Sequence, residues 1–431
     1  MIFYKWGVYM GLNDTPLGSR FQIGLFGRTN AGKSSLANTI TGQDLAIVSD
    51  RKGTTTDPVT KTMELLPIGP VAVTDTPGFD DNSELGALRI EKTKEIMSRI
   101  DMGLVVFDAA AEDDPVFIRN IIKDLERRKC PSVIVANKID QLSGKAKLRE
   151  LEEAFKGHTF LGVSCLSGEG IEELKALIGK LWKEVEEDKQ ERKIVSDLIE
   201  PGDTVILVIP IDSSAPKGRI ILPQQQTLRD ILDAGGNALC IKDTELKELF
   251  DNNPGWTDPS STSAGICRRP SLVITDSQVF KEVDAIVPKS IRLTSFSILM
   301  ARYKGELDWQ MSGAESIDSL EDGDRVLVAE GCTHHRQCDD IGTVKLPRLI
   351  RRYTGKDIEL DSTSGHGYPK DLSRYKMIFH CGSCMLGENE VRARVGLARE
   401  QNIPITNYGM AIAYMNGIFN RATAVFLEKK D

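Results

Sequence analysis

The stretch Gln22-Ile-Gly-Leu-Phe-Gly-Arg-Thr-Asn-Ala-Gly-Lys-Ser34 decides the fold of the first part of this 431-residue chain. Its apolar residues 22–26 predict a buried strand, and residues 35–41 are compatible with a helix. Between them stands the pattern Gly-x-x-x-x-Gly-Lys-Ser of a phosphate loop, whose glycines let backbone N–H groups approach phosphate oxygens. Lys33 is expected to reach the β- and γ-phosphates, and the Ser34 hydroxyl to ligate Mg²⁺. The loop residues expected to contact nucleotide are Gly27, Asn30, Ala31, Gly32, Lys33, Ser34 and Ser35.

Two further segments carry groups that a GTP-hydrolysing domain needs around its Mg²⁺. The apolar strand predicted at 71–74 ends at Asp75-Thr-Pro-Gly78, where Asp75 can meet Mg²⁺ through water and the Gly78 N–H can sense the γ-phosphate. The preceding polar loop can supply a hydroxyl to the same ion, with Thr55 as first choice and Thr54 or Thr56 as alternatives. The predicted catalytic residues are Lys33, Thr55 and Gly78.

The choice of base is predicted by Asn137-Lys-Ile-Asp140, which follows an apolar strand at 132–136. The Asp140 carboxylate can accept hydrogen bonds from two N–H groups of guanine, a pairing that adenine does not offer. After a last strand at 159–163, Ser164 and Cys165 stand where a backbone N–H would meet the guanine carbonyl. The cofactor-binding set is therefore completed by Asn137, Lys138, Asp140, Ser164 and Cys165, with the Cys165 thiol expected to pack rather than react.

Across about 165 residues these motifs resemble those of the translation-factor-related GTPases of the Era and MnmE type. In the cation-dependent members of that group the position of Asn30 coordinates K⁺, so the resemblance implies potassium-stimulated hydrolysis. The alternative is an Asn that only stabilises the loop. Phe79 stands where Ras-like enzymes carry the Gln that orients water, which implies slow intrinsic hydrolysis.

Cysteine and histidine cluster in two short pieces of the last third, Cys332-Thr-His334 and His380-Cys-Gly-Ser-Cys384. Strands predicted at 325–329 and 377–379 would deliver both pieces to one edge of a parallel sheet, so the pieces can converge on one metal site. Zinc held by Cys₃His and a 4Fe-4S cluster held by three cysteines both fit, and the spacing does not decide between them. The neighbouring His335, Cys338 and His366 are expected to be bystanders.

Composition limits the partners and the compartment. The formal net charge of −8 disfavours a nucleic-acid partner held by bulk electrostatics, although a local patch occurs at Arg348, Arg351 and Arg352. Eight scattered cysteines do not resemble a disulfide framework, which favours a reduced, cytoplasmic protein. The apolar run 409–419 is too short to span a bilayer, so we expect a buried helix or hairpin and no membrane partner.

The chain is predicted to be α/β, with a P-loop GTPase domain at 1–190 followed by two smaller α/β domains with mainly parallel sheets. A charged helix from 171 to about 193 is expected to close the first domain. The second domain, 195–285, alternates strands and helices without a catalytic constellation and is expected to be an assembly module. Its helix is predicted at 228–234, after a loop and turn at 216–223. The third domain, 286–431, is expected to begin with a strand at 291–293.

The conjunction of a GTPase, a siteless α/β module and the two cysteine pieces is similar to the HydF family of FeFe-hydrogenase maturation GTPases. The resemblance implies a dimerisation domain, a homodimer or higher oligomer, and a 4Fe-4S cluster at Cys332, Cys381 and Cys384, with His334 and His380 as uncertain ligands. It also implies a scaffold that receives a CO- and CN-bearing diiron precursor from radical-SAM maturases and passes it to apo-hydrogenase. The alternatives weighed are an RNA- or ribosome-associated Era-like GTPase with structural zinc, and a redox enzyme.

Overall fold

The structure is a computed structural model that describes residues 15, 17–42, 58–77, 84–111, 115–190, 192–211, 220–257, 268–331 and 341–427. The described residues form two compact units, one within Thr15–Glu191 and one within Arg192–Asp431. The first unit is the expected GTPase domain. The second holds both of the smaller α/β modules, which share a core.

The first unit contains a six-stranded sheet with the strand order β2-β3-β1-β4-β5-β6. All neighbouring strands are parallel except β2 and β3. Its elements are β1 (Phe21–Phe26), α1 (Lys33–Thr41), β2 (Val59–Leu65), β3 (Gly69–Asp75), α2 (Glu84–Met97), β4 (Met102–Asp108), α3 (Pro115–Arg127), β5 (Ser132–Asn137), α4 (Lys145–Ala154), β6 (Phe160–Gly162) and α5 (Ile171–Gln190). The strands predicted on either side of the nucleotide motifs are therefore confirmed.

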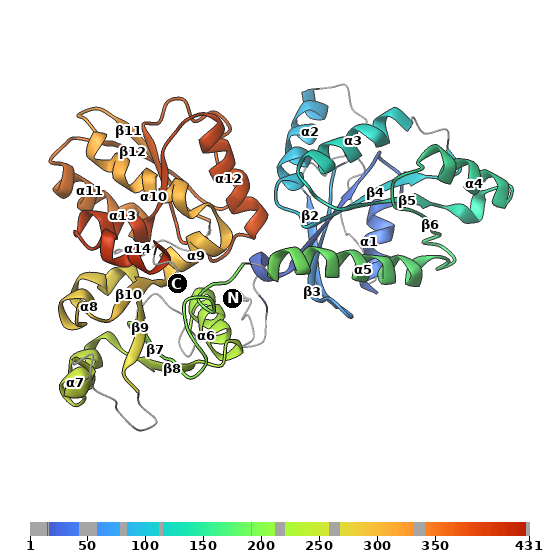
Figure 1. Cartoon of the computed structure of the whole chain (residues 1–431). Coiled ribbons are helices and arrows are strands. Elements are labelled where there is room, and N and C mark those ends of the chain that lie inside the picture. Colours follow the sequence, from blue (N-terminus) through green and yellow to red (C-terminus); the bar gives the residue numbers. More distant parts are fainter. Residues whose placement is uncertain are drawn as a thin grey trace, which may run out of the picture. The chain divides into compact units, whose positions relative to one another are not determined.

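The central strands of this sheet are buried on both faces. Helices α1 and α5 pack on one face, and α2 and α3 cover the other (Figure 1). Burial on both faces explains why β1, β4 and β5 are almost continuously apolar rather than alternating. Parallel strands also carry their carboxyl ends to one edge, which is where the nucleotide motifs follow them.

The second unit contains two four-stranded parallel sheets, with the strand orders β10-β9-β7-β8 and β12-β11-β13-β14. Its elements are β7 (Thr204–Val208), α6 (Leu222–Asp233), β8 (Asn237–Ile241), α7 (Leu246–Asp251), β9 (Pro270–Thr275), α8 (Phe280–Ile286), β10 (Arg292–Ser295), α9 (Phe296–Lys304), α10 (Leu307–Glu315), β11 (Arg325–Ala329), α11 (Leu346–Thr354), β12 (Glu359–Thr363), β13 (Met377–His380), α12 (Glu388–Glu400), β14 (Ile405–Asn407), α13 (Tyr408–Met415) and α14 (Phe419–Leu427).

The predicted boundary at 285/286 is wrong, because it cuts the first of these two sheets. β10 follows that boundary but pairs in parallel with β9, with Leu293 opposite Val273. The C-terminal helix α14 also returns to this sheet, where Arg421 donates to the carbonyls of Val287 and Ile291. One hydrophobic core consequently contains residues of β7, β9, α13 and α14.

The helix predicted at 228–234 begins earlier, at Leu222. Pro223 occupies the first turn, where a missing N–H costs nothing, and the Gln224 side chain accepts from the Ile221 N–H at 3.0 Å. The predicted turn therefore contains a helix start. The apolar run 409–419 forms most of α13 and the start of α14, and no helix in the described part of the chain is long and apolar enough to cross a membrane.

Candidate functional site

The phosphate loop lies between β1 and α1, and two glycines fix its path. Gly27 has φ of 150°, and a Cβ there would lie 2.0 Å from the Val106 carbonyl oxygen. Gly32 has φ of 90°, and a Cβ there would lie 2.1 Å from Nδ2 of Asn137. Any side chain at these positions would push the loop away from its neighbours, so the conformation depends on glycine.

Lys33, Ser34 and Asp75 lie together at this loop. Nζ of Lys33 donates to the carbonyls of Gly27 (3.0 Å) and Arg28 (2.8 Å), so the buried lysine bends back over the loop. The Ser34 hydroxyl donates to Oδ2 of Asp75. Oδ1 of Asp75 is buried and has no hydrogen-bond partner among the described residues. A hydroxyl beside an unpaired carboxylate oxygen is a donor set that suits Mg²⁺.

Burial raises the pKa of Asp75, whereas Ser34 and Lys33 oppose that rise. A bound cation would remove the penalty by pairing with the ionised carboxylate. The residues Asn30 and Ser35 of the same loop are exposed, and Asn30 adopts the left-handed conformation with φ of 64°. The predicted Thr55 and Gly78, together with Thr54, Thr56 and Phe79, lie outside the described residues.

The predicted base-recognition residues converge on Asn137. Its Nδ2 donates to the Ala31 carbonyl at 3.1 Å, and its Oδ1 accepts from the Cys165 N–H at 3.3 Å. This buried amide therefore joins the phosphate loop to the segment at Ser164, which sequence reasoning did not predict. Cys165 itself packs against the core, as expected.

Two contacts orient residues that the sequence predicts to recognise guanine. The Ser164 hydroxyl donates to Oδ1 of Asp140 at 2.5 Å, which orients the carboxylate. Nζ of Lys138 pairs with Oδ2 of Asp108 at 2.6 Å. Asp108 was missed because it belongs to no recognised motif, although its place at the end of β4 puts it on the functional edge of the sheet.

The cysteine site begins where β11 and β13 end, and these strands are parallel neighbours as predicted. Ala329 stands opposite His380, and the Cys381 N–H donates to the Ala329 carbonyl at 2.9 Å. The Gly331 N–H in turn donates to Sγ of Cys381 at 3.0 Å. The chain leading to residue 332 therefore lies against Cys381, although Cys332, His334, His335 and Cys338 lie outside the described residues.

Cys381 and Cys384 are free thiols on the loop after β13. Burial raises the pKa of Cys381 to about 11, which the N–H groups of Ser383 and Gly331 oppose. Burial likewise raises the pKa of Cys384, and Lys304 opposes that rise. Two half-buried thiols, one of which accepts from two backbone N–H groups, suit a soft metal or an iron-sulfur group, whose binding would stabilise the thiolates. Within the described residues no group of three or more potential metal ligands occurs.

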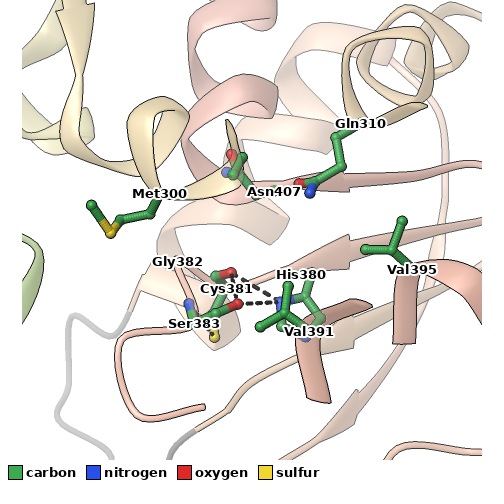
Figure 2. A pocket seen from close by; sticks show the side chains of 10 residues that line it. Met300, Gln310, His380, Cys381, Gly382, Ser383, Val391, Val395 and Asn407 are labelled. Atoms are coloured by element: carbon green, nitrogen blue, oxygen red, sulfur yellow. Dashed lines mark hydrogen bonds between the residues drawn. The ribbon is translucent and has the colours of Figure 1, made fainter. Parts of the chain in front are cut away.

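His380 is buried, and both of its ring nitrogens have protein partners. Figure 2 shows the contacts with Cys381 and Ser383. Nδ1 lies 3.0 Å from the Ser383 hydroxyl and from the Cys381 carbonyl, and Arg394 donates to Nε2 at 3.2 Å. Burial and the Arg394 charge lower the pKa of His380 to about 4, so the ring is neutral near pH 7. This arrangement disfavours His380 as a metal ligand. The imidazole instead stabilises the loop through its hydrogen bonds.

Behind His380 lies a buried ion pair that sequence reasoning missed. Arg394 and Glu390 of α12 are 2.6 Å apart, and Arg394 also donates to the Gly365 carbonyl. Nδ1 of His366 lies 2.9 Å from the same Glu390 oxygen. His366, expected to be a bystander, is thus connected to His380 through two side chains. The spacing of Glu390 and Arg394, four residues apart on a helix, was the available sequence signal.

The first unit defines the class of the protein, a P-loop GTPase. Residues 22–138 match the family model described as 50S ribosome-binding GTPase. The chain is 34% identical over 170 residues to the tRNA modification GTPase MnmE of Aquifex aeolicus, covering 38% of this chain and 36% of that protein. It is 38% identical over 188 residues to GTPase Obg of the same organism, covering 40% and 52%. To GTPase Era of Clostridioides difficile it is 31% identical over 251 residues, covering 54% and 81%.

The second unit identifies the family. Residues 194–305 match the model described as the hydrogen maturase F dimerization domain, and residues 308–425 match the hydrogen maturase F tetramerization domain. These two models together match more than half of the chain. The chain therefore belongs to the hydrogen maturase F, or HydF, family, as its motifs predicted. The MnmE and Obg relatives are matched over only about a third to a half of their own lengths.

Proposed function

We propose that the protein is a GTP-hydrolysing scaffold that carries a 4Fe-4S cluster and assembles and delivers the diiron subcluster of FeFe-hydrogenase. The observation that carries this proposal is the combination, in one chain, of a phosphate-loop GTPase unit and two hydrogen maturase F modules, the second of which contains the cysteine loop. The diiron precursor with its CO and CN groups is the cargo. Radical-SAM maturases would supply it and the apo-hydrogenase would receive it, in the cytoplasm.

On the nucleotide side, GTP is the substrate, and GDP and phosphate are the products. Asp75 and Ser34 would hold Mg²⁺, with Thr55 as the further hydroxyl ligand, and Lys33 would contact the β- and γ-phosphates. The unpaired Oδ1 of Asp75 supports this assignment. The Gly78 N–H would contact the γ-phosphate, and Asn30 would coordinate K⁺ and so stimulate hydrolysis.

On the metal side, Cys332, Cys381 and Cys384 would hold the cluster. Three thiolates leave one iron of a 4Fe-4S cluster for an exchangeable ligand, which is useful to a protein that loads and releases cargo. The free, half-buried thiols of Cys381 and Cys384 and the N–H groups that donate to Cys381 support this assignment. The dimerization and tetramerization modules support a homo-oligomer as the working state.

The Era-like alternative, an RNA- or ribosome-associated GTPase with structural zinc, is not favoured. The model described as 50S ribosome-binding GTPase matches residues 22–138, whereas residues 194–305 and 308–425 match maturase modules. The formal net charge of −8 also opposes a surface that neutralises many phosphates.

The decisive experiment compares anaerobically purified wild type with Cys381→Ala and with Cys240→Ala, whose exposed thiol provides a matched control. Iron, sulfide and zinc contents and the electron paramagnetic resonance spectrum of the reduced protein are measured together with GTP hydrolysis in K⁺ and Na⁺ buffers. We expect Cys381→Ala alone to lose iron and sulfide, with GTP turnover unchanged and faster in K⁺. Stoichiometric zinc without iron in reconstituted wild type would contradict the proposal.

A further inference from the structure

A buried lysine holds the cysteine loop from outside its own sheet. Lys304 is the last residue of α9 and is only 4% exposed. Its Nζ donates to the carbonyls of Ser383 (3.0 Å) and Leu386 (3.1 Å). These two carbonyls stand on either side of Cys384, so a single side chain brackets that cysteine.

The location of Lys304 calls for a compensating charge. Lysine is almost never fully buried without one, because removing an ammonium group from water is costly. No carboxylate in the described part of the chain forms an ion pair with Lys304. The groups that favour its charged form are the sulfur atoms of Cys384 and Cys381. Burial lowers the pKa of Lys304, and these two sulfur atoms oppose that fall. As thiolates, with a metal bound, they would be the negative partners of the ammonium group among the described residues.

Two further residues of α9 lie beside this loop. Ala301 and Met300 line a small cavity together with Cys381, Ser383 and Asn407, and Figure 2 labels the last four of these residues. Asn407, at the end of β14, donates to the Ser297 carbonyl at 2.8 Å. Helix α9 lies within residues 194–305, the dimerization module, whereas the cysteine loop lies within residues 308–425. One helix of the first module thus forms a wall of the cysteine site in the second.

We propose that Lys304 is a positioning residue that holds the loop 381–386 in its metal-binding conformation and compensates the charge of the thiolates. The loop role rests on the two carbonyl contacts. The charge role rests on the proposed 4Fe-4S cluster, since a nearby positive charge favours the reduced, more negative form. Because Lys304 contacts the carbonyls on either side of Cys384, a displacement of α9 in the dimerization module would also move Cys384.

The test uses the full chain with Lys304→Met, which keeps the length of the side chain and removes its charge, and Lys304→Arg, which keeps the charge. Lys289→Met is the matched control, because Lys289 is exposed and paired with Asp284. Hydrogen exchange of the amides at 382–387 is measured in metal-free protein, and the midpoint potential is measured in the anaerobically reconstituted protein. Lys304→Gln replaces Lys304→Met if the latter does not fold.

We expect Lys304→Met to exchange at least tenfold faster at these amides and to have a more negative midpoint potential than wild type. Lys304→Arg should restore the potential, and Lys289→Met should match wild type in both measurements. Folded Lys304→Met with wild-type exchange and wild-type potential overturns the proposal, and faster exchange with an unchanged potential overturns the charge role. If wild type takes up no cluster, the proposed function fails, while the exchange rates still decide whether Lys304 positions the loop.

Discussion

The nucleotide site and the cysteine site are built in different ways. At the nucleotide site, most groups come from short motifs that directly follow strands of one sheet, such as Gly27–Ser34 after β1 and Asn137–Asp140 after β5. At the cysteine site, only the loop 380–384 is of this kind. Lys304 and Arg394 support this loop; they lie on two helices and belong to no sequence motif.

This difference follows from what each site has to stabilise. Phosphates are recognised by backbone N–H groups and a helix N-terminus, which a glycine-rich turn provides locally. The thiols and the neutral buried histidine need charged groups and hydrogen-bond donors held around them. Side chains from other elements of the fold supply these groups. Substitutions that damage the nucleotide site should therefore lie in its own motifs. Substitutions that damage the cysteine site should also include residues far from the loop in sequence.

The largest expected effect is at Lys33. Lys33→Ala removes the ammonium group that would contact the transferred phosphate, so GTP hydrolysis should fall by about 10²–10³-fold or more. Phosphate release under single-turnover conditions measures this change, and the iron content should equal that of wild type. Lys147→Ala, at an exposed lysine of α4, is the control and should hydrolyse GTP normally. Loss of iron in Lys33→Ala would show that the two sites are not separable.

Arg394→Met should destabilise the cysteine site from a distance. It removes the buried guanidinium that is paired with the Glu390 carboxylate, and breaking a buried ion pair typically costs about 3–5 kcal/mol. Hydrogen exchange of the β13 and α12 amides in metal-free protein reports this loss. The double variant Glu390→Gln/Arg394→Met should recover part of the stability, because no unpaired charge remains.

The control for that experiment is Arg399→Met, on the same helix. Arg399 is exposed and pairs with Glu306 at 2.8 Å, so its loss should cost less than about 1 kcal/mol. Equal effects of Arg394→Met and Arg399→Met would remove the evidence that buried distant residues support the cysteine loop.

The smallest expected effect is at Ser164, where the supporting contact lies within the nucleotide site itself. Ser164→Ala removes one hydrogen bond to the Asp140 carboxylate, so the affinity for GTP should fall by roughly fivefold, or about 1 kcal/mol. Titration with a fluorescent guanine nucleotide measures it, with Ser167→Ala as the matched exposed control. A loss as large as that of Asp140→Ala would mean that Ser164 contacts the base directly.

Much of the GTPase unit was predictable because its strands are apolar and its motifs contiguous. The strand β1, the helix α1 and the placement of Lys33 and Ser34 follow from one contiguous stretch, and Asp75 follows from its place at the end of the apolar strand β3. The predicted boundary at 285/286 failed for the opposite reason. A four-residue strand such as β10 does not reveal which sheet it joins, since its partner β9 is chosen by the packing of α8 and α14.

At the cysteine site the sequence by itself determined which cysteines of the loop we propose as metal ligands and that parallel strands lead to them. It did so because the spacing of Cys381 and Cys384 and the apolar runs of β11 and β13 are local properties of the chain. Only the tertiary structure decided that the ring nitrogens of His380 are hydrogen-bonded to Arg394 and Ser383. It also decided that Lys304 donates to the carbonyls on either side of Cys384. Those contacts join residues up to 82 positions apart in the sequence. Which residues meet depends on what is buried together in the folded chain, and no local sequence pattern encodes that.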